Sequence, residues 1–194
     1  GGHARYVAVD VTDADGLAAA LADVRSDWGA ISLVIHGAGV LADKAIADKT
    51  QDQFDFVYDT KIGGLQALLA ATAEDAPGFV MFSSVAARCG NQGQCDYAMA
   101  NEVLNKLTHT LAAHGRLAKS LGWGPWEGGM VTPALKARFE SLGVPLIPLD
   151  VGARMLVDEI ADATSDRELV LGGEPRPEAL LSKGTADRIL ELEV

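Results

Sequence analysis

A tyrosine, an asparagine, a serine and a lysine have the types and spacings that proton-transfer chemistry needs. Tyr97 and Asn101 are four residues apart, so in a helix they share one face. Ser84 precedes Tyr97 by thirteen residues and ends an apolar run typical of a strand. A tyrosine beside a strand-end hydroxyl can act as a proton donor. Lys61 lies on the apolar stripe of another helical pattern, and an ammonium beside a phenol lowers the pKa of that phenol.

Each of these residues also has an ordinary structural explanation. A tyrosine on an apolar helix face usually belongs to the core, and a lysine there can extend its ammonium towards solvent. Paired hydroxyls at a strand end, here Ser83 and Ser84, often cap a helix or line a turn. The string from His36 to Gly39 suits a plain turn as well as a ligand held close to the backbone of Gly37 and Gly39. His36 itself is expected to be structural.

The elements that must position these residues follow from the hydrophobic pattern. Short apolar runs are typical of parallel strands buried on both faces. These runs cover residues 6–10, 32–36, 79–83, 117–123 and 168–172. Apolar residues at helical spacing predict helices over residues 14–28, 51–73, 96–114 and 150–163. Asp13 or Asp15 is expected to cap the first of them.

Strand alternating with helix predicts a doubly wound α/β fold with a parallel, Rossmann-like sheet. Ligands bind beyond the carboxyl ends of the strands in such sheets, which is where Ser84 lies. The usual N-terminal strand and Gly-rich phosphate turn are not found, since the sequence contains no G-x-G-x-x-G. We expect one folded unit over residues 1–173, followed by a tail or linker over residues 174–194.

The composition is that of an acidic globular chain of one-domain size. The chain has 194 residues, of which 48% are hydrophobic and 22% charged, and these values disfavour disorder. Asp and Glu number 27 against 16 Lys and Arg, so the net charge is −11. Such a charge disfavours nucleic acid and anionic membranes as partners.

Cysteine content and hydropathy exclude further classes. Cys89 and Cys95 are too few for a disulfide framework, and no base or metal-ligand cluster accompanies them. No apolar run approaches the roughly 18 residues that a membrane-spanning helix needs, and no signal peptide opens the chain. A cytoplasmic protein without a metal is therefore expected. Asp96, beside Tyr97, is expected to be solvated.

Taken together, these motifs resemble the ketoreductase domains of type I polyketide and polyunsaturated fatty acid synthases, within the short-chain dehydrogenase/reductase superfamily. The resemblance covers about residues 3–172. The matching strings are residues 9–11, 36–41, 60–64, 82–84, 97–101 and 123–126. Ordinary short-chain dehydrogenases have a lysine four residues after the tyrosine, where this chain has Asn101. The synthase domains share this exchange, with Lys61 in the role of the lysine.

The resemblance implies reduction of a β-ketoacyl thioester, carried by an acyl carrier protein, with NADPH as the hydride donor. Tyr97 would then donate a proton to the ketone oxygen, and Ser84 would hydrogen-bond the same oxygen. Lys61 would hold the pKa of Tyr97 down and bond the nicotinamide ribose. Asn101 would hold water or orient Lys61 in a proton relay.

The same resemblance assigns cofactor positions to three parts of the chain. Residues 10–11 would flank the adenine, residues 37–39 its ribose, and residues 124–126 the nicotinamide. The implied cofactor-binding residues are Asp10, Val11, Gly37, Ala38, Gly39, Lys61, Tyr97, Gly124, Pro125 and Trp126.

Substrate contacts and stereochemistry are implied in the same way. Residues 131–142 would form a lid helix, with Met130 as a substrate contact. Asp43 ends a Leu-Ala-Asp string that resembles the Leu-Asp-Asp signature of ketoreductases forming the 3R alcohol, although the alanine departs from it. The tryptophan that marks the opposite stereochemistry would stand at Cys89 and is absent. A 3R product is therefore expected.

The chain departs from the family in lacking the first strand, the Gly-rich turn and the residues that select the 2′-phosphate, which would precede Gly1. NADPH, as against NADH, is implied by the family alone. We expect a second segment to complete the sheet, because strand 6–10 would otherwise leave an unpaired edge. Two alternatives stay open: a non-catalytic structural subdomain, which usually lacks the tyrosine, serine and lysine, and a free-standing dehydrogenase, against which Asn101 argues.

Overall fold

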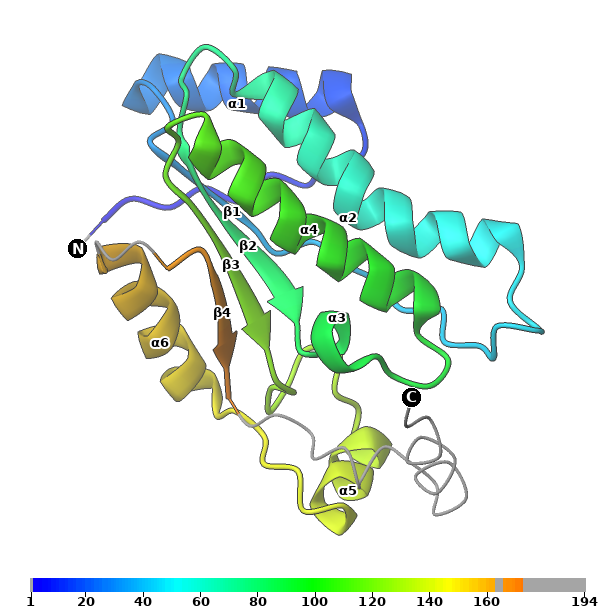
Figure 1. The fold of residues 1–194 in the computed structure, drawn as a ribbon. Helices are drawn as coiled ribbons and strands as arrows, with labels where there is room; N and C mark the ends of the chain where they lie inside the picture. Colours follow the sequence, from blue (N-terminus) through cyan, green and yellow to red (C-terminus); the bar gives the residue numbers. More distant parts are fainter. Residues whose placement is uncertain (1, 163–165, 173–194) are drawn as a thin grey trace.

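The computed structural model describes residues 2–162 and 166–172, in which helices lie on both faces of a parallel sheet (Figure 1). The strands lie in chain order, with every neighbouring pair parallel. They are β1 (Leu33–His36), β2 (Gly78–Ser84), β3 (Ala118–Trp123) and β4 (Glu168–Leu171). The helices are α1 (Ala14–Trp28), α2 (Gln51–Ala71), α3 (Ala86–Cys89), α4 (Cys95–Ala113), α5 (Pro133–Ser141) and α6 (Leu149–Ala161). These elements confirm the predicted α/β sheet.

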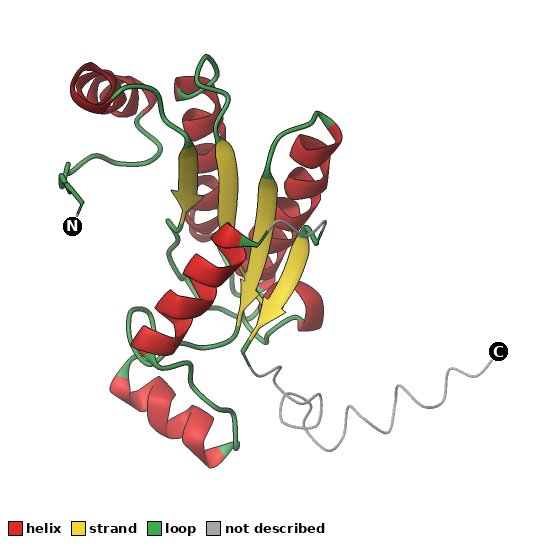
Figure 2. Cartoon of the chain, turned by 90° about the vertical axis from the view of Figure 1, so that its left-hand side faces the viewer, coloured by secondary structure: helices red, strands yellow, loops and turns green. Residues whose placement is uncertain are grey.

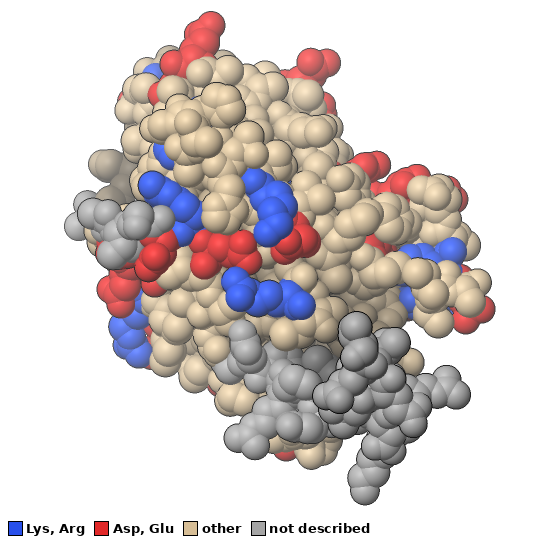
Figure 3. Space-filling model, in the orientation of Figure 1, with Lys and Arg blue, Asp and Glu red and all other residues tan. Residues whose placement is uncertain are grey.

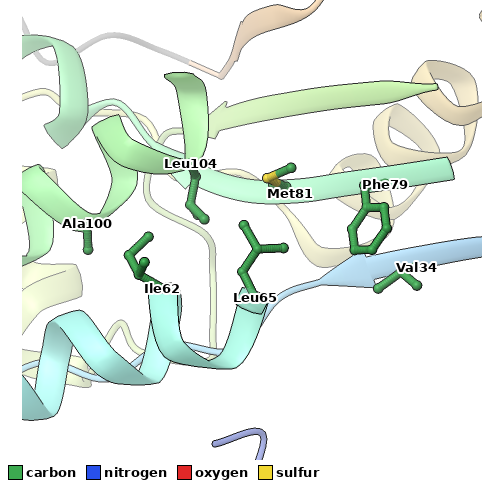
Figure 4. Close-up of a cluster of buried hydrophobic side chains, with 7 residues drawn as sticks. All are labelled: Val34, Ile62, Leu65, Phe79, Met81, Ala100 and Leu104. Atoms are coloured by element: carbon green, nitrogen blue, oxygen red, sulfur yellow. The ribbon is translucent and has the colours of Figure 1, made fainter. Parts of the chain in front are cut away.

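Each face of the sheet has its own hydrophobic cluster, because successive side chains of a strand point to opposite faces. Helices α2 and α4 cover one face, and α6 covers the other (Figure 2). The cluster beneath α2 and α4 contains Val34, Ile62, Leu65, Phe79, Met81, Ala100 and Leu104 (Figure 4). The cluster beneath α6 contains Val80, Leu121, Trp123, Ile147 and Leu171. Burial on both faces explains the continuous apolar runs in the sequence.

Side-chain caps fix where the site-bearing helices begin. Thr50 and Gln53 form a reciprocal capping box at the start of α2, which satisfies backbone N–H groups that have no partner inside the helix. Asp13, not Asp15, caps α1 by accepting from the N–H of Gly16 at 3.0 Å. Thr132 caps α5. The short helix α3 was not predicted, since four residues carry no readable periodicity.

The predicted strand over residues 6–10 is wrong: this segment is irregular and exposed, with Tyr6 90% and Val7 47% accessible. Residues 6–10 pair with none of the four strands, whose order in the described sheet is β1-β2-β3-β4. The unpaired edge therefore belongs to β1, where Ile35 is 46% exposed.

Residues 174–194 lie outside the described residues, so the proposed domain boundary stays a prediction. Among the helices that the structure describes, none is both long and apolar enough to cross a membrane. Acidic and basic side chains intermingle on the face that carries α4 (Figure 3). There Glu168 of β4 pairs with Arg88 at 2.9 Å and lies 3.8 Å from Lys106, which ties the strand to α3 and α4.

Candidate active site

The candidate residues meet at the carboxyl ends of β1, β2 and β3, as a doubly wound sheet predicts. Lys61 comes from the middle of α2, Ser84 from the last position of β2, and Tyr97 and Asn101 from the first turns of α4. Helices α2 and α4 lie side by side on one face of the sheet (Figure 1). Three elements far apart in the sequence thus bring four polar side chains to one end of the fold.

Lys61 is 3% exposed, and its Nζ donates to the carbonyl of Phe82 at 2.8 Å. Nζ also lies 5.7 Å from the centre of the Tyr97 ring. Burial lowers the pKa of Lys61 to about 8. A Cβ at Gly39 would stand 3.1 Å from Cε of Lys61, so the glycine leaves the room that this buried ammonium occupies.

Tyr97 is half-buried at the start of α4. Burial raises the pKa of its phenol, the side chains of Ser84 and Asn101 act in the opposite direction, and the charge of Asp43 adds to the rise. The phenol therefore keeps its proton at neutral pH and is available as an acid. Hydrogen bonding by the side chains of Ser84 and Asn101 is the cause of the opposing effect.

The neighbouring serines have different roles. Ser83 is buried, and its hydroxyl donates to the carbonyl of Asn101 at 3.1 Å, so it anchors α4 to β2. Ser84 Oγ accepts from the N–H of Ala86 at 3.1 Å, and its hydroxyl proton can be directed towards the Tyr97 side. Ser84 therefore lines the turn after β2, whereas Ser83 joins β2 to α4 and neither caps a helix nor lines a turn.

Asn101 is fully buried, and its Nδ2 donates to the carbonyl of Tyr97 at 2.8 Å. Its Oδ1 is buried and has no hydrogen-bond partner in the described part of the chain. A buried acceptor of this kind normally has a protein or water partner. Asn101 thus offers a free acceptor to a water or to another donor at the site.

His36 has the structural role expected of it. Its Nε2 lies 2.8 Å from the carbonyl of Lys61, which requires a proton on that nitrogen, so the imidazole links β1 to α2. Burial lowers the pKa of His36. The neutral imidazole holds the backbone of Lys61 in register with the end of β1.

The residues assigned to the adenine side lie along one edge of the described fold. Asp10 is exposed, and its carboxylate accepts from the N–H and hydroxyl of Thr12. Val11 is half-buried against Gly64 of α2, where an added Cβ would come within 2.7 Å of its Cγ1. Gly37 is exposed and Ala38 half-buried in the loop after β1. These four positions share no polar contact with the Tyr97 cluster among the hydrogen bonds of the described residues, whereas Gly39, the fifth, lies beside Lys61.

The loop assigned to the nicotinamide side is held firmly. The N–H of Gly124 donates to the carbonyl of Leu171 at 2.8 Å, and the carbonyl of Pro125 accepts from Ile147 at the same distance. Trp126 packs over Gly152 of α6, where an added Cβ would lie 2.3 Å from its ring. The loop after β3 is therefore fixed by β4, by residue 147 and by α6.

The two residues predicted to contact the substrate are Asp43 and Met130. Asp43 is exposed, and its Oδ2 accepts from Nε2 of Gln94 at 2.9 Å. Met130 is 41% exposed, with its Cε 3.7 Å from the position a Cβ of Gly39 would take. Helix α5, which follows Met130, buries none of its residues. Asp43 therefore contacts the N-cap residue of α4, and Met130 lies towards Lys61.

The expectation that Asp96 is solvated is wrong. Its side chain is 1% exposed and pairs with Nζ of Lys49, itself 4% exposed, at 2.6 Å. The partner lies 47 residues earlier in the chain, and no local pattern links the two. One feature of the sequence could have indicated this burial: Asp96 stands in the first turn of an apolar helix, directly before the candidate tyrosine. A second buried lysine was also missed: Lys119 of β3 pairs with Glu159 of α6 at 3.2 Å.

The arrangement suits proton donation to an oxygen that gains negative charge, with a phenol as donor, a hydroxyl as second hydrogen-bond donor and an ammonium behind the phenol. Among the described residues, no group of three or more His, Cys, Asp or Glu side chains could hold a metal ion.

Known proteins resemble this chain in sequence. A family model described as "KR domain" matches residues 1–128. One polyunsaturated fatty acid synthase polypeptide, from Thraustochytrium sp., is 42% identical over 179 residues, which cover 91% of this chain and 6% of that protein. Mycoketide-CoA synthase of Mycobacterium tuberculosis is 38% identical over 151 residues, or 74% of this chain and 4% of that protein. The chain thus spans a small part of the length of these relatives.

Solved structures resemble the fold over most of its length. PlmKR1, the ketoreductase from the first module of phoslactomycin biosynthesis in Streptomyces sp., has a TM-score of 0.80 and 25% identity. The match covers 91% of this chain and 43% of that one. A structure of A-type ketoreductases from a modular polyketide synthase has a TM-score of 0.78 and 30% identity, with 91% of this chain and 40% of that chain covered.

Proposed function

The chain belongs to the KR domain family, whose members here are parts of polyketide and polyunsaturated fatty acid synthases, and from this premise we propose a specific activity. The chain is the catalytic part of an NADPH-dependent reductase of β-ketoacyl thioesters carried by an acyl carrier protein. The observation that carries the proposal is the meeting of Tyr97, Lys61 and Ser84 at the end of β2, with Lys61 buried behind the Tyr97 ring.

The residues have distinct tasks in this reaction. Bound NADPH supplies a hydride to the β-carbon of the substrate. Tyr97 donates its proton to the ketone oxygen as negative charge develops there, and Ser84 hydrogen-bonds the same oxygen and orients the ketone. Lys61 stabilises the phenolate that remains on Tyr97. Asn101, with its free buried Oδ1, holds the water or donor through which the proton on Tyr97 is replaced.

The nicotinamide half of the cofactor fits the residues present. Lys61 is buried with an ammonium near the phenol, and backbone hydrogen bonds hold the loop 124–126 beside the end of β3. On this proposal Gly124, Pro125 and Trp126 flank the nicotinamide. The adenine half would be held by Asp10, Val11 and the backbone of Gly37, Ala38 and Gly39.

The phosphate cradle is proposed to come from a further segment of polypeptide. The sequence contains no G-x-G-x-x-G, and the edge of β1 is unpaired in residues 2–162 and 166–172. A parallel strand that pairs with β1 would bring a helix N-terminus to the carboxyl ends of the strands, where pyrophosphate binds. The same strand would cover the exposed Ile35.

Substrate position and product configuration are the finer parts of the proposal. Asp43 and Met130 contact the acyl substrate, and the exposed helix α5 closes over it as a lid. The product is the 3R-hydroxyacyl thioester, on the strength of Asp43 and of Cys89 where the opposite class has tryptophan.

A second candidate function is a structural subdomain without catalysis. It predicts that NADPH binds, if at all, without turnover. The survival of Tyr97, Ser84 and Lys61 together at one site favours the enzyme. A free-standing dehydrogenase is disfavoured by Asn101 at the position where such enzymes have lysine.

The test is NADPH oxidation with a β-ketoacyl thioester, measured with and without the polypeptide that completes the sheet. We expect turnover only in the completed domain and a loss of at least about 100-fold in Tyr97→Phe, since proton transfer contributes on that order. Tyr58→Phe is the matched control, because Tyr58 packs against Phe54 on α2 and takes no part in the site. Cofactor binding without turnover in the completed wild-type domain would favour the structural subdomain.

A further inference from the structure

Lys49 and Asp96 form a buried ion pair between the two helices that carry the candidate catalytic residues. Lys49 directly precedes Thr50, the N-cap of α2, which carries Lys61. Asp96 lies in the first turn of α4, directly before Tyr97. The two charges are 2.6 Å apart, and their side chains are 4% and 1% exposed.

Both partners of this pair have a second contact with the backbone. Nζ of Lys49 also donates to the carbonyl of Ala42 at 2.8 Å, in the loop that follows β1. Oδ1 of Asp96 accepts from the N–H of Tyr97 itself at 2.9 Å. Gln94, the N-cap residue of α4, makes no side-chain cap, so Asp96 satisfies one of the free N–H groups at this end.

The loop after β1 and the start of α4 are joined at two further points. The N–H of Lys44 donates to the carbonyl of Gly93 at 3.0 Å. Gln94 donates to Asp43 and accepts from Nδ2 of Asn91, each at 2.9 Å. The ion pair is therefore the buried member of a row of contacts between the loop after β1 and the start of α4. One of its contacts is with the backbone N–H of Tyr97.

A buried ion pair is weak evidence for stability, since the cost of desolvating two charges offsets their attraction. Replacement of such a pair by well-packed apolar residues is often neutral or stabilising. The geometry gives a different reason for the pair, because its two contacts end on the backbone N–H of Tyr97 and on the loop that holds Asp43.

We propose that the Lys49–Asp96 pair positions the Tyr97 phenol, by holding the first turn of α4 against the loop after β1 and the start of α2. The inference rests on the proposed function, in which Tyr97 is the proton donor. Neither Lys49 nor Asp96 touches substrate or cofactor on this proposal, and both act through Tyr97.

The test is made in the full-length protein with the double variant Lys49→Met, Asp96→Asn. It removes both charges, and the amide can still accept from the N–H of Tyr97, so the fold should survive. We expect kcat to fall at least 10-fold, the KM for NADPH to stay within about twofold, and the melting temperature to change by no more than a few degrees. Lys49→Arg, which preserves the ion pair, should keep at least a third of the wild-type kcat.

Asp96→Glu is the second variant, in case the double variant does not fold. It retains the charge pair and lengthens one partner by a methylene, so Tyr97 should shift and kcat should fall in a protein that melts like the wild type. The matched control is Arg25→Met, Asp75→Asn. Arg25 also joins an ion pair to a backbone carbonyl, that of Ala71, but at the opposite end of α2. The control should lower the melting temperature and leave kcat unchanged.

A spectroscopic arm separates this inference from the proposed function. The ring signals of ¹³C-labelled Tyr97 should move in the Lys49 and Asp96 variants and stay in place in the Arg25 and Asp75 control. If the wild type reduces β-ketoacyl thioesters and a folded double variant or Asp96→Glu keeps kcat within twofold, the positioning role is overturned. If the wild type shows no reduction, the proposed function fails, and an unmoved Tyr97 signal overturns the positioning role independently.

Discussion

At the scale of one residue, Lys61 is a candidate functional side chain whose burial lowers the stability of the folded chain. Its pKa lies at about 8 in the folded chain, below the ordinary 10.5, because burial disfavours the charged form. At neutral pH both the folded and the unfolded chain carry this proton, and the folded chain bears a cost of about 3 kcal/mol. That cost is relieved as the pH rises from about 8 towards 10.5, where the unfolded chain still holds the proton and the folded chain has lost it.

We therefore predict that Lys61→Met abolishes turnover and raises the free energy of unfolding at pH 7. The advantage of the variant over the wild type should shrink by about 3 kcal/mol between pH 7 and pH 10.5. Urea denaturation of both proteins at the two pH values measures it. Lys136 is the control: it is exposed, its pKa is raised by hydrogen bonding to Glu127, and Lys136→Met should show a change of the opposite sign. An advantage that is independent of pH would contradict the assignment.

The adjacent serines give a second prediction at this scale. Ser84→Ala should lower kcat about 100-fold, the usual effect of removing one donor to a developing oxyanion, with little change in stability. Ser83→Ala should destabilise the fold by about 1 kcal/mol, because its bond to the carbonyl of Asn101 is buried. Steady-state kinetics and thermal melts of both variants measure these effects. Equal kinetic losses in the two variants would remove the distinction between them.

Site residues can be predicted from the sequence where residues nearby in the chain determine their surroundings. Tyr97, Ser84 and Lys61 could be chosen because residue type, helix face and strand end are local properties, and the structure brings them to one end of the sheet. The burial of Asp96 could not be predicted, since its partner Lys49 is distant in the chain and an acid in a first helical turn is usually exposed. The four-residue spacing from Tyr97 also indicates Asn101, whereas its free buried Oδ1 is a structural finding.

At the scale of the elements, the loop after β3 depends on a contact with α6. Alanine normally stabilises a helix over glycine by about 1 kcal/mol. At Gly152 the added Cβ would lie 2.3 Å from the Trp126 ring, so we predict the opposite sign. Gly152→Ala should lower the melting temperature and weaken NADPH binding in the completed domain, because Trp126 must move.

Gly63 in α2 is the matched control for this prediction. A Cβ there would meet the Cβ of Asp59 at 3.7 Å, an ordinary contact, so Gly63→Ala should raise stability by about 1 kcal/mol. Differential scanning calorimetry of the two variants measures both effects. If Gly152→Ala is also stabilising, the packing of Trp126 on α6 does not fix the loop.

The hydrophobic pattern predicted four strands and four helices within a few residues, because each of these elements has its neighbours within the chain. It failed for residues 6–10, where the pattern is as clear as elsewhere. A strand needs a partner for its backbone hydrogen bonds, and the pattern does not say whether the partner is present. The exposure of Tyr6 and Val7 shows the result.

At the scale of the whole molecule, β1 forms one edge of the described sheet and has no strand partner on that side. An exposed parallel edge flanked by apolar side chains favours association with other chains. We predict that the 194-residue chain alone self-associates and binds NADPH weakly, and that adding the segment that completes the sheet gives a monodisperse domain with firm binding. Light scattering after size exclusion, with and without that segment, measures this. A stable, monomeric chain that binds NADPH alone would contradict the prediction.

The strand order also has a consequence for biosynthesis. Because β1, β2, β3 and β4 lie in the sheet in the order in which they are translated, each strand can dock onto its predecessor as it leaves the ribosome. No later strand has to insert between two formed ones, so the contacts made during synthesis are between near neighbours in the chain, which favours rapid folding. The growing sheet extends away from β1, and the edge at which we propose a further segment is therefore the first one formed. A polypeptide thousands of residues long, on the scale of the synthases related to this chain, would gain from folding this part before the rest is made.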